Sequence, residues 1–312
     1  MSSSAAILLA VGVAAALSAR AAAGAAGAQT PASGATAATT SSESSSASST
    51  TLTTSSAALT TTTTTTETIA ANPCQRRSLH LRCPDLVMSA PSELHLDTTT
   101  IPGRLLLRAT SSVNSLGAGP IELRARRGAH RRWIVSQAIY DRRGHVHLFR
   151  TRVQLVYKYI PGYRYEYGYV GSTSYWKVRH LASFQLWSLG PHLRLERLVR
   201  TGPKVDYCLR DLARTHPSRR SPTSAVYPGC SEQADISHDL FGTSVGWSDI
   251  YPYGYPEQWI DVTGLRGRFA FVQIVNPRNL WWESNTANNA SETFVQLPSG
   301  RVIGERVGVP AP

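Results

Sequence analysis

Lysine is scarce in this chain, and one lysine lies in a stretch whose residue types could support chemistry. Arginine outnumbers lysine 29 to 3, so the chain meets its need for positive charge with arginine. Lys204, in TGPKVDYCLRD, is therefore poorly explained as generic surface charge. A second stretch, GTSVGWSDIY, carries Asp249 and Tyr251 two positions apart. An amine, a phenol and a carboxylate can exchange protons or form covalent bonds with a substrate.

These stretches and three others resemble the lysyl oxidase family. The others are CPDLVMSAP, VNSLGAGPIELR and NPRNLWWESNTANN, and the similarity runs in order between about residues 83 and 290. That family comprises secreted copper amine oxidases whose quinone cofactor is built from one lysine and one tyrosine of their own chain. The resemblance implies an enzyme that oxidises primary amines, such as peptidyl lysine, to aldehydes and releases ammonia and hydrogen peroxide.

By their positions in the motifs, Lys204 and Tyr251 would form the lysine tyrosylquinone. The tyrosine ring must be hydroxylated beside bound Cu(II) and then attacked by the lysine amine, so the resemblance implies that the two side chains meet. We expect Lys204 to precede a strand that Cys208 pins, and Tyr251 to lie in a turn-rich loop. Asp249 would be the base that removes the α-proton of the bound amine.

Two interpretations of the copper site are open. The family binds copper through closely spaced histidines, and His145 and His147 are such a pair, because alternate residues of a strand share a face and imidazole suits Cu(II). The alternative aligns the histidine box with STSYWKVRH, directly before LASFQLWSL. Three residues then stand at the histidine positions and none is a normal copper ligand: Thr173, Tyr175 and Lys177. We favour this alignment because both flanks match, and it predicts a domain without copper or quinone.

The charge of the chain favours anionic partners. Residues 1–72 carry one Arg and two Glu, so removing their net −1 from the total of +12 leaves the remainder at +13. Acidic polysaccharide, anionic lipid or sulfated glycan fits this balance, whereas we expect no nucleic acid for a secreted protein. A basic turn supplies guanidinium groups that can dock sulfate or carboxylate bidentately. They belong to Arg124, Arg126, Arg127, Arg131 and Arg132.

The elements that must position these residues are predicted to be strands. Short segments rich in β-branched and aromatic residues recur between turn formers: 103–110, 120–126, 132–140, 145–160, 182–189, 258–263, 268–276 and 293–297. This pattern predicts an all-β fold, an antiparallel β-sandwich. The tyrosine-rich run around residues 157–176 contains Pro and Gly and is predicted as a long loop or a pair of ragged edge strands.

Composition divides the chain into three parts. Residues 1–28 contain a 13-residue apolar run, Ala5–Leu17, which is typical of a signal peptide and too short for a transmembrane segment of roughly 20 residues. Residues 29–71 are almost all Ser, Thr and Ala, which predicts a disordered stalk. Residues 72–312 are predicted to form the lysyl-oxidase-like sandwich domain. The expected location is secreted or at the cell surface.

Four cysteines in a secretory chain indicate two disulfides, and four cysteines allow three pairings. We favour the pairs that are close in sequence, Cys74 with Cys83 and Cys208 with Cys230.

Two classes of function therefore follow from the sequence. One is a copper and quinone-dependent oxidase of primary amines. The other is a catalytically silent module that keeps the fold and binds anionic polymers at the cell surface or in the matrix. The charge of +13 on the domain would repel lysine-rich protein substrates, which favours the silent class.

Overall fold

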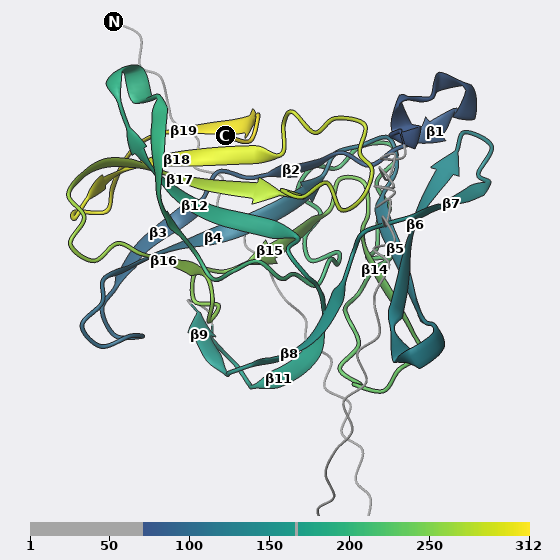
Figure 1. Cartoon of the computed structure of the whole chain (residues 1–312), viewed down its shortest axis with the longest axis horizontal. Coiled ribbons are helices and arrows are strands. Elements are labelled where there is room, and N and C mark those ends of the chain that lie inside the picture. Colours follow the sequence, from purple (N-terminus) through teal and green to yellow (C-terminus); the bar gives the residue numbers. More distant parts are fainter. Residues whose placement is uncertain (1–70, 166–167) are drawn as a thin grey trace, which may run out of the picture. The chain divides into compact units, whose positions relative to one another are not determined.

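Two antiparallel sheets pack face to face and enclose the core (Figure 1). The computed structural model describes residues 71–165 and 168–312, so the predicted signal peptide and nearly all of the stalk lie outside the described residues. The first sheet contains, in spatial order, β13 (Leu195–Thr201), β12 (Ala182–Leu189), β17 (Gly267–Val275), β18 (Ala290–Leu297) and β19 (Arg301–Val309). In the second sheet, β4 (Leu106–Ser115) pairs with β15 (Ser248–Tyr251), β16 (Trp259–Asp261), β2 (Leu86–Met88) and β3 (Ser92–Asp97). The predicted antiparallel β-sandwich is confirmed.

The core lies between these two sheets because their facing strands alternate apolar side chains inward. Phe184 of β12 and Phe271 of β17 meet edge to face with ring centroids 5.7 Å apart. Leu107 of β4 and Ile260 of β16 are fully buried in the same cluster. Burying one such side chain contributes roughly 1.5–3 kcal/mol to the free energy of folding, so this core stabilises the packing of the two sheets against each other.

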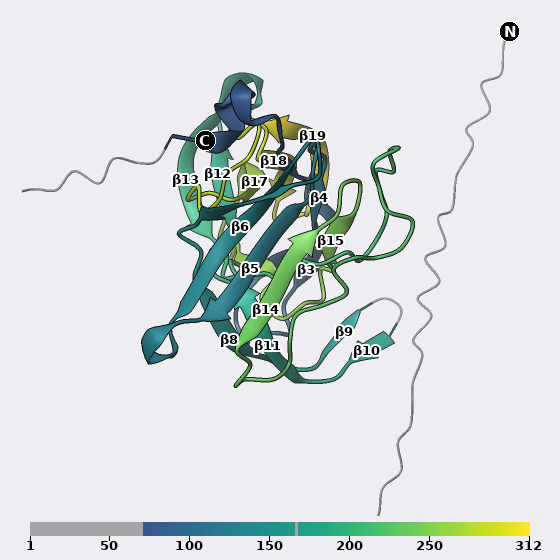
Figure 2. The ribbon, with the colours of Figure 1, turned by 90° about the vertical axis from the view of Figure 1, so that its right-hand side faces the viewer.

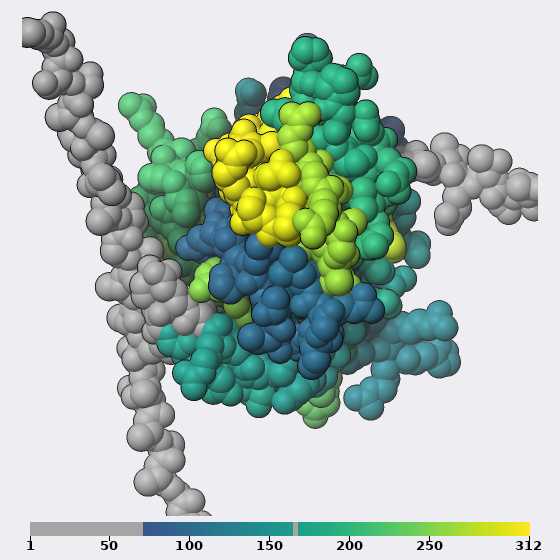
Figure 3. All heavy atoms as spheres, turned by 90° about the vertical axis from the view of Figure 1, so that its left-hand side faces the viewer, coloured from purple at the N-terminus to yellow at the C-terminus, as the bar shows by residue number. Residues whose placement is uncertain are grey.

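The start of the domain is held against its last strands. The Ser291 hydroxyl donates to the Met88 carbonyl at 2.6 Å, and the Thr293 hydroxyl donates to the Pro91 carbonyl at 2.7 Å. Figure 3 shows the blue N-terminal segment of the domain beside the yellow C-terminal strands. Residues about 200 positions apart therefore close the sandwich at this edge.

A third antiparallel sheet adjoins the sandwich, and its long strands lie side by side in Figure 2. It contains β1 (Leu81–Arg82), β6 (Trp133–Asp141), β5 (Ile121–Arg127) and β14 (His238–Thr243), with β7 (Val146–Arg150) on the other edge of β6. The basic turn connects β5 to β6, and the His145 and His147 pair stands at the start of β7.

Two small hairpins complete the fold. β8 (Leu155–Ile160) pairs with β11 (Thr173–Val178), and β9 (Tyr163–Tyr165) pairs with β10 (Gly168–Val170). The prediction of one strand over residues 145–160 is wrong. The chain leaves the third sheet after β7, where the Arg152 amide donates to the Leu280 carbonyl at 3.1 Å, and then starts the separate strand β8. The short 3-10 helices are η1 (Pro73–Gln75), η2 (Arg77–Leu79), η3 (Ala129–Arg131) and η4 (Pro191–Leu193).

Both predicted disulfides are confirmed. Cys74 is bonded to Cys83 and Cys208 to Cys230, with Cα atoms 5.9 and 5.8 Å apart. The second disulfide closes a sequence separation of 22 residues and fixes the segment that follows Lys204.

Among the residues that the structure describes, no helix has the length and apolar character needed to cross a membrane.

Candidate functional site

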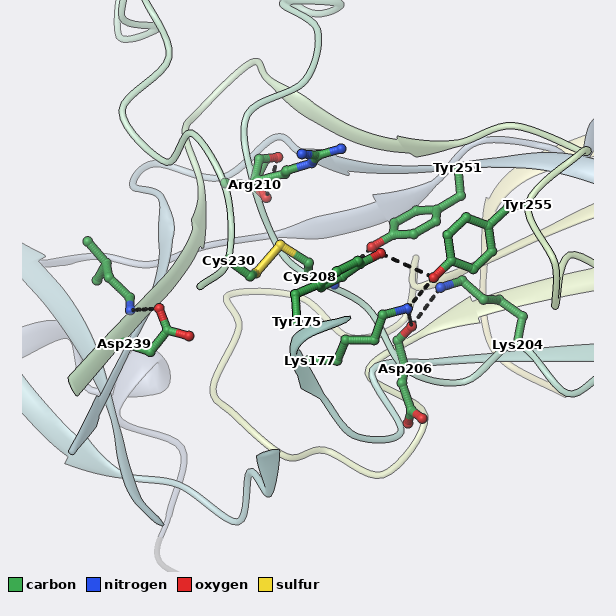
Figure 4. The surroundings of a disulfide bond; sticks show 12 residues. Tyr175, Lys177, Lys204, Asp206, Cys208, Arg210, Cys230, Asp239, Tyr251 and Tyr255 are labelled. Carbon is green, nitrogen blue, oxygen red and sulfur yellow. Dashed lines mark hydrogen bonds between the residues drawn. A yellow bond between two sulfur atoms is a disulfide. The ribbon is translucent and has the colours of Figure 1, made fainter. Parts of the chain in front are cut away.

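Lys204 and Tyr251 meet, as the resemblance implies. The Lys204 Nζ lies 3.7 Å from the centroid of the Tyr251 ring (Figure 4). Tyr251 is the last residue of β15 and not part of a turn-rich loop. Lys204 lies in an extended segment, and the predicted strand after it is reduced to one bridge, in which Tyr207 and Val178 exchange backbone hydrogen bonds. This bridge fixes how far the Lys204 side chain reaches into the interior of the domain.

The Tyr251 ring is enclosed by other aromatic rings. Tyr207 packs on it edge to face at 4.6 Å and Tyr255 at 4.9 Å. The Tyr251 hydroxyl accepts a hydrogen bond from the Cys208 amide at 2.9 Å. Burial raises the pKa of Tyr251 well above its ordinary value, and the nearby Asp249 adds to the rise. The phenol therefore stays protonated at neutral pH.

The Lys204 amine is fully buried and is surrounded by rings rather than carboxylates. Its Nζ donates to the Asp206 carbonyl at 2.6 Å and lies over the rings of Tyr207 and Tyr255 at 4.0 and 4.4 Å. Burial lowers the pKa of Lys204 well below its ordinary value, and repulsion from Lys177 lowers it further. The amine is thus held in surroundings that favour its neutral form.

Residues of β11 face the same pair. The Tyr175 hydroxyl lies 3.1 Å from the Tyr255 hydroxyl, and the Lys177 Nζ donates to the Tyr255 hydroxyl at 2.5 Å. Trp176 points to the opposite side and packs on Trp133 at 5.1 Å. Tyr175 and Lys177, which are alternate residues of this strand, therefore both contact Tyr255.

Asp249 shares the buried environment of this pair. Its side chain is fully buried on β15, and neither carboxylate oxygen has a hydrogen-bond partner within the described residues. Burial raises the pKa of Asp249 to about 7, against the attraction of Arg210, Lys204 and Lys177. A carboxyl group with that pKa can take up or release a proton near neutrality, as the predicted general base must.

The structure does not bring His145 and His147 to this site. The two imidazoles lie on the third sheet, where His145 Nδ1 and His147 Nε2 are 3.1 and 3.5 Å from the Asp141 carboxylate. The side chain of His145 is 70% exposed. Within residues 71–165 and 168–312, no group of three or more His, Cys, Asp or Glu side chains is arranged to hold a metal.

The side chains around the Lys204 and Tyr251 pair do not fit Cu(II). Copper in proteins takes imidazole and thiolate ligands, whereas the groups here are protonated phenols, two amines and the single carboxyl of Asp249. Lys177 lies 5.6 Å from the Tyr251 ring centroid, and its protonated form, which predominates below its pKa of about 8, would repel a divalent cation at that place. The donor set therefore disagrees with the copper that the resemblance implies.

Several residues of the site were not identified from the sequence. Tyr255 contacts both buried lysines, and the Asp206 carbonyl accepts hydrogen bonds from both. Lys158 of β8 lies opposite Tyr175 in the strand register and bonds the Asp206 carboxylate at 3.2 Å. The scarcity of lysine was the available signal, since all three lysines of the chain gather here.

Comparison with known proteins finds one matching family. Residues 165–304 match the family model described as lysyl oxidase. The matched segment contains Lys177, Lys204, Asp249 and Tyr251, but it begins after His145 and His147. No curated protein matches the chain.

Proposed function

We propose that the chain is a catalytically silent member of the lysyl oxidase family that binds anionic polymers at the cell surface or in the matrix. The observation that carries the silent assignment is the presence of Tyr175 and Lys177, instead of imidazoles, on the strand that faces the Lys204 and Tyr251 pair. Copper is needed to oxidise the tyrosine, so a site without its ligands leaves the lysine and the phenol unmodified.

Chain secreted from copper-replete cells is expected to contain Lys204 and Tyr251 in separate, unmodified peptides. Metal analysis should find substoichiometric copper, and the protein should lack visible quinone absorption. Peptide mass spectrometry is the deciding measurement. Stoichiometric copper that is lost in a His145→Ala and His147→Ala variant, together with a cross-linked Lys204–Tyr251 peptide, would refute the silent assignment.

The binding assignment is supported by the charge of +13 on residues 73–312 and by the basic turn. Two of the five arginines of the basic turn are engaged in contacts within the protein. Arg124 pairs with Glu122 at 2.7 Å, and the Arg127 guanidinium lies over the rings of Trp133 and Trp176 at 4.1 and 4.8 Å. The three that are exposed and have no ion pair within the described residues are Arg126, Arg131 and Arg132. These three are the proposed contacts for sulfate or carboxylate groups.

Changing these three arginines to glutamine is expected to weaken binding to heparin about tenfold, since three exposed charge contacts of about 0.5 kcal/mol each add to that factor. The matched control changes three exposed arginines on and beside the edge strand β13, Arg194, Arg197 and Arg200, and removes the same charge. Titration calorimetry at constant salt compares the variants. Equal weakening by both triple variants would assign binding to net charge alone and contradict a site at the turn.

A second candidate function, oxidation of primary amines, is favoured by the 3.7 Å approach of Lys204 to the Tyr251 ring. Release of hydrogen peroxide on addition of a primary amine, abolished by Lys204→Arg, would establish it in place of the silent assignment.

A further inference from the structure

All three lysines of this arginine-rich chain converge on one place. Lys177 and Lys204 both donate to the Asp206 carbonyl, at 3.3 and 2.6 Å, and Lys158 bonds the carboxylate of the same residue. Arginine supplies the charge elsewhere. The property that lysine has and arginine lacks is an amine that can lose its proton near neutral pH. The convergence of the three lysines therefore indicates that this part of the protein uses the neutral form of a lysine amine.

The surroundings of Lys177 favour that neutral form. Its side chain is fully buried, and burial lowers the pKa of Lys177 to about 8. Lys204 lies beside it, and two ammonium groups repel each other in a buried site. Lys158 differs: burial draws its pKa down, but Glu257 at 2.5 Å and Asp206 outweigh that effect and raise it. A desolvated lysine next to a second amine is the usual arrangement of a lysine nucleophile.

A cavity lies next to the two buried amines. Its volume is about 310 Å³, and its wall includes three of the four rings that the amines contact, Tyr175, Tyr251 and Tyr255. Lys177 lies 5.1 Å from the centroid of the first and 4.8 Å from that of the third. One layer of tyrosine rings separates the amine from the cavity. Tyr175 is partly exposed and its hydroxyl lies 3.1 Å from the Tyr255 hydroxyl, so a small molecule reaches the amine by displacing this ring.

We propose that Lys177 binds small aldehydes that enter this cavity by forming a Schiff base with them. The Nζ lone pair attacks the carbonyl carbon, the carbonyl oxygen takes up the proton that nitrogen loses, and the resulting carbinolamine releases water to leave a C=N bond. No oxidant is required. The ligand class is a compact aldehyde with an apolar or aromatic body, which the tyrosine wall accepts. The inference rests on the proposed function, because a quinone on Tyr251 would consume Lys204 and alter the site.

The full-length chain, treated with benzaldehyde and sodium cyanoborohydride, is expected to acquire one benzyl group on Lys177. Because Lys177 holds far more neutral amine than Lys158 at pH 7.5, its labelling should be at least about tenfold faster although Lys158 is the more exposed. Peptide mass spectrometry quantifies each lysine separately, and the presence of only three lysines makes the assignment direct. After unfolding in urea the three lysines should be labelled at similar rates.

Label confined to Lys158 or to the chain's amino terminus, with Lys177 unmodified in the folded protein, overturns the inference. Label on Lys204 in place of Lys177 overturns the assignment as well. The same peptides report on the proposed function independently, because a cross-linked Lys204–Tyr251 peptide would contradict the silent assignment whatever Lys177 does. No variant is needed, so a failure to fold cannot obscure the result.

Discussion

Replacing Arg108 with alanine is expected to lower the free energy of unfolding by about 3–5 kcal/mol, because it leaves a buried carboxylate without its partner. The Arg108 Nε lies 2.6 Å from the Asp97 carboxylate, and both side chains are less than 10% exposed. The same guanidinium donates to the Tyr253 and Tyr255 carbonyls at 3.0 and 3.1 Å. Arg108 of β4 thus holds the turn that carries Tyr255 into the site, so the variant should lose both stability and the order of that turn.

Arg104→Ala is the matched control for this prediction. Arg104 also pairs with a carboxylate, Asp261 at 3.1 Å, but its side chain is 56% exposed. An exposed pair contributes at most about 1 kcal/mol. Urea unfolding followed by tryptophan fluorescence compares the two variants. Equal losses in both would show that Arg108 acts as a surface pair and does not organise the turn.

The strands that could be predicted are those with clear apolar alternation. Residues 182–189 were predicted as a strand and coincide with β12, where buried and partly buried side chains alternate. β13 and β19 were missed, because LERLVRT and RVIGERVGV each place three charged residues among their apolar ones and lie on the two edges of their sheet. β4 extends five residues beyond its predicted end at 110, through the polar sequence SSVNS. Those polar residues are paired by neighbouring strands, which sequence alone does not reveal.

The site could be predicted only in part, because the depth of a buried side chain depends on contacts between segments that are distant in sequence. The approach of Lys204 to Tyr251 followed from motif position, and the structure places both in one cluster. The buried position of Lys177 did not follow from the sequence, because strand alternation predicts which face of the sheet a side chain lies on but not how deeply it is buried. That depth depends on the bridge between Val178 and Tyr207 and on the turn that brings Tyr255 over the amine. Both are contacts between segments that are distant in sequence.

Raising the pH from 8 to 9 is expected to increase the free energy of unfolding by about 2 kcal/mol, with about half of the increase from each of the two buried lysines, Lys177 and Lys204. Below pH 8, Lys177 is protonated in both the native and the unfolded chain, and the cost of burying its charge is fully present. Its pKa is about 8 in the native protein and 10.5 ordinarily, so between these values the native state binds fewer protons than the unfolded chain. Lys177 therefore contributes a rise in stability with pH across this interval.

Other titrating groups set the limits of the pH range over which stability rises. Lys204, whose pKa burial also lowers, adds to the rise. Burial raises the pKa values of Asp249 and Glu283 to about 7, so both carboxyls have largely lost their protons before the interval begins. Above pH 9, tyrosines begin to ionise in the unfolded chain, while burial raises the pKa of Tyr207 and of other buried tyrosines in the native protein, and this effect opposes the rise. The maximum is expected between pH 9 and 10.

The contribution of the buried amine is isolated by Lys177→Met, which keeps the volume of the side chain and removes the titrating group. Its stability curve between pH 8 and 9 should rise about half as much as that of the unchanged protein, because Lys204 remains. Lys158→Met is the control and should retain the full rise, since Lys158 is partly exposed and its carboxylate partners raise its pKa. Urea midpoints measured at each pH provide the curves. A flat curve for the unchanged protein, or an equal rise after Lys177→Met, would mean that the amine is solvated and charged throughout, and the site would then lack the neutral lysine on which aldehyde binding depends.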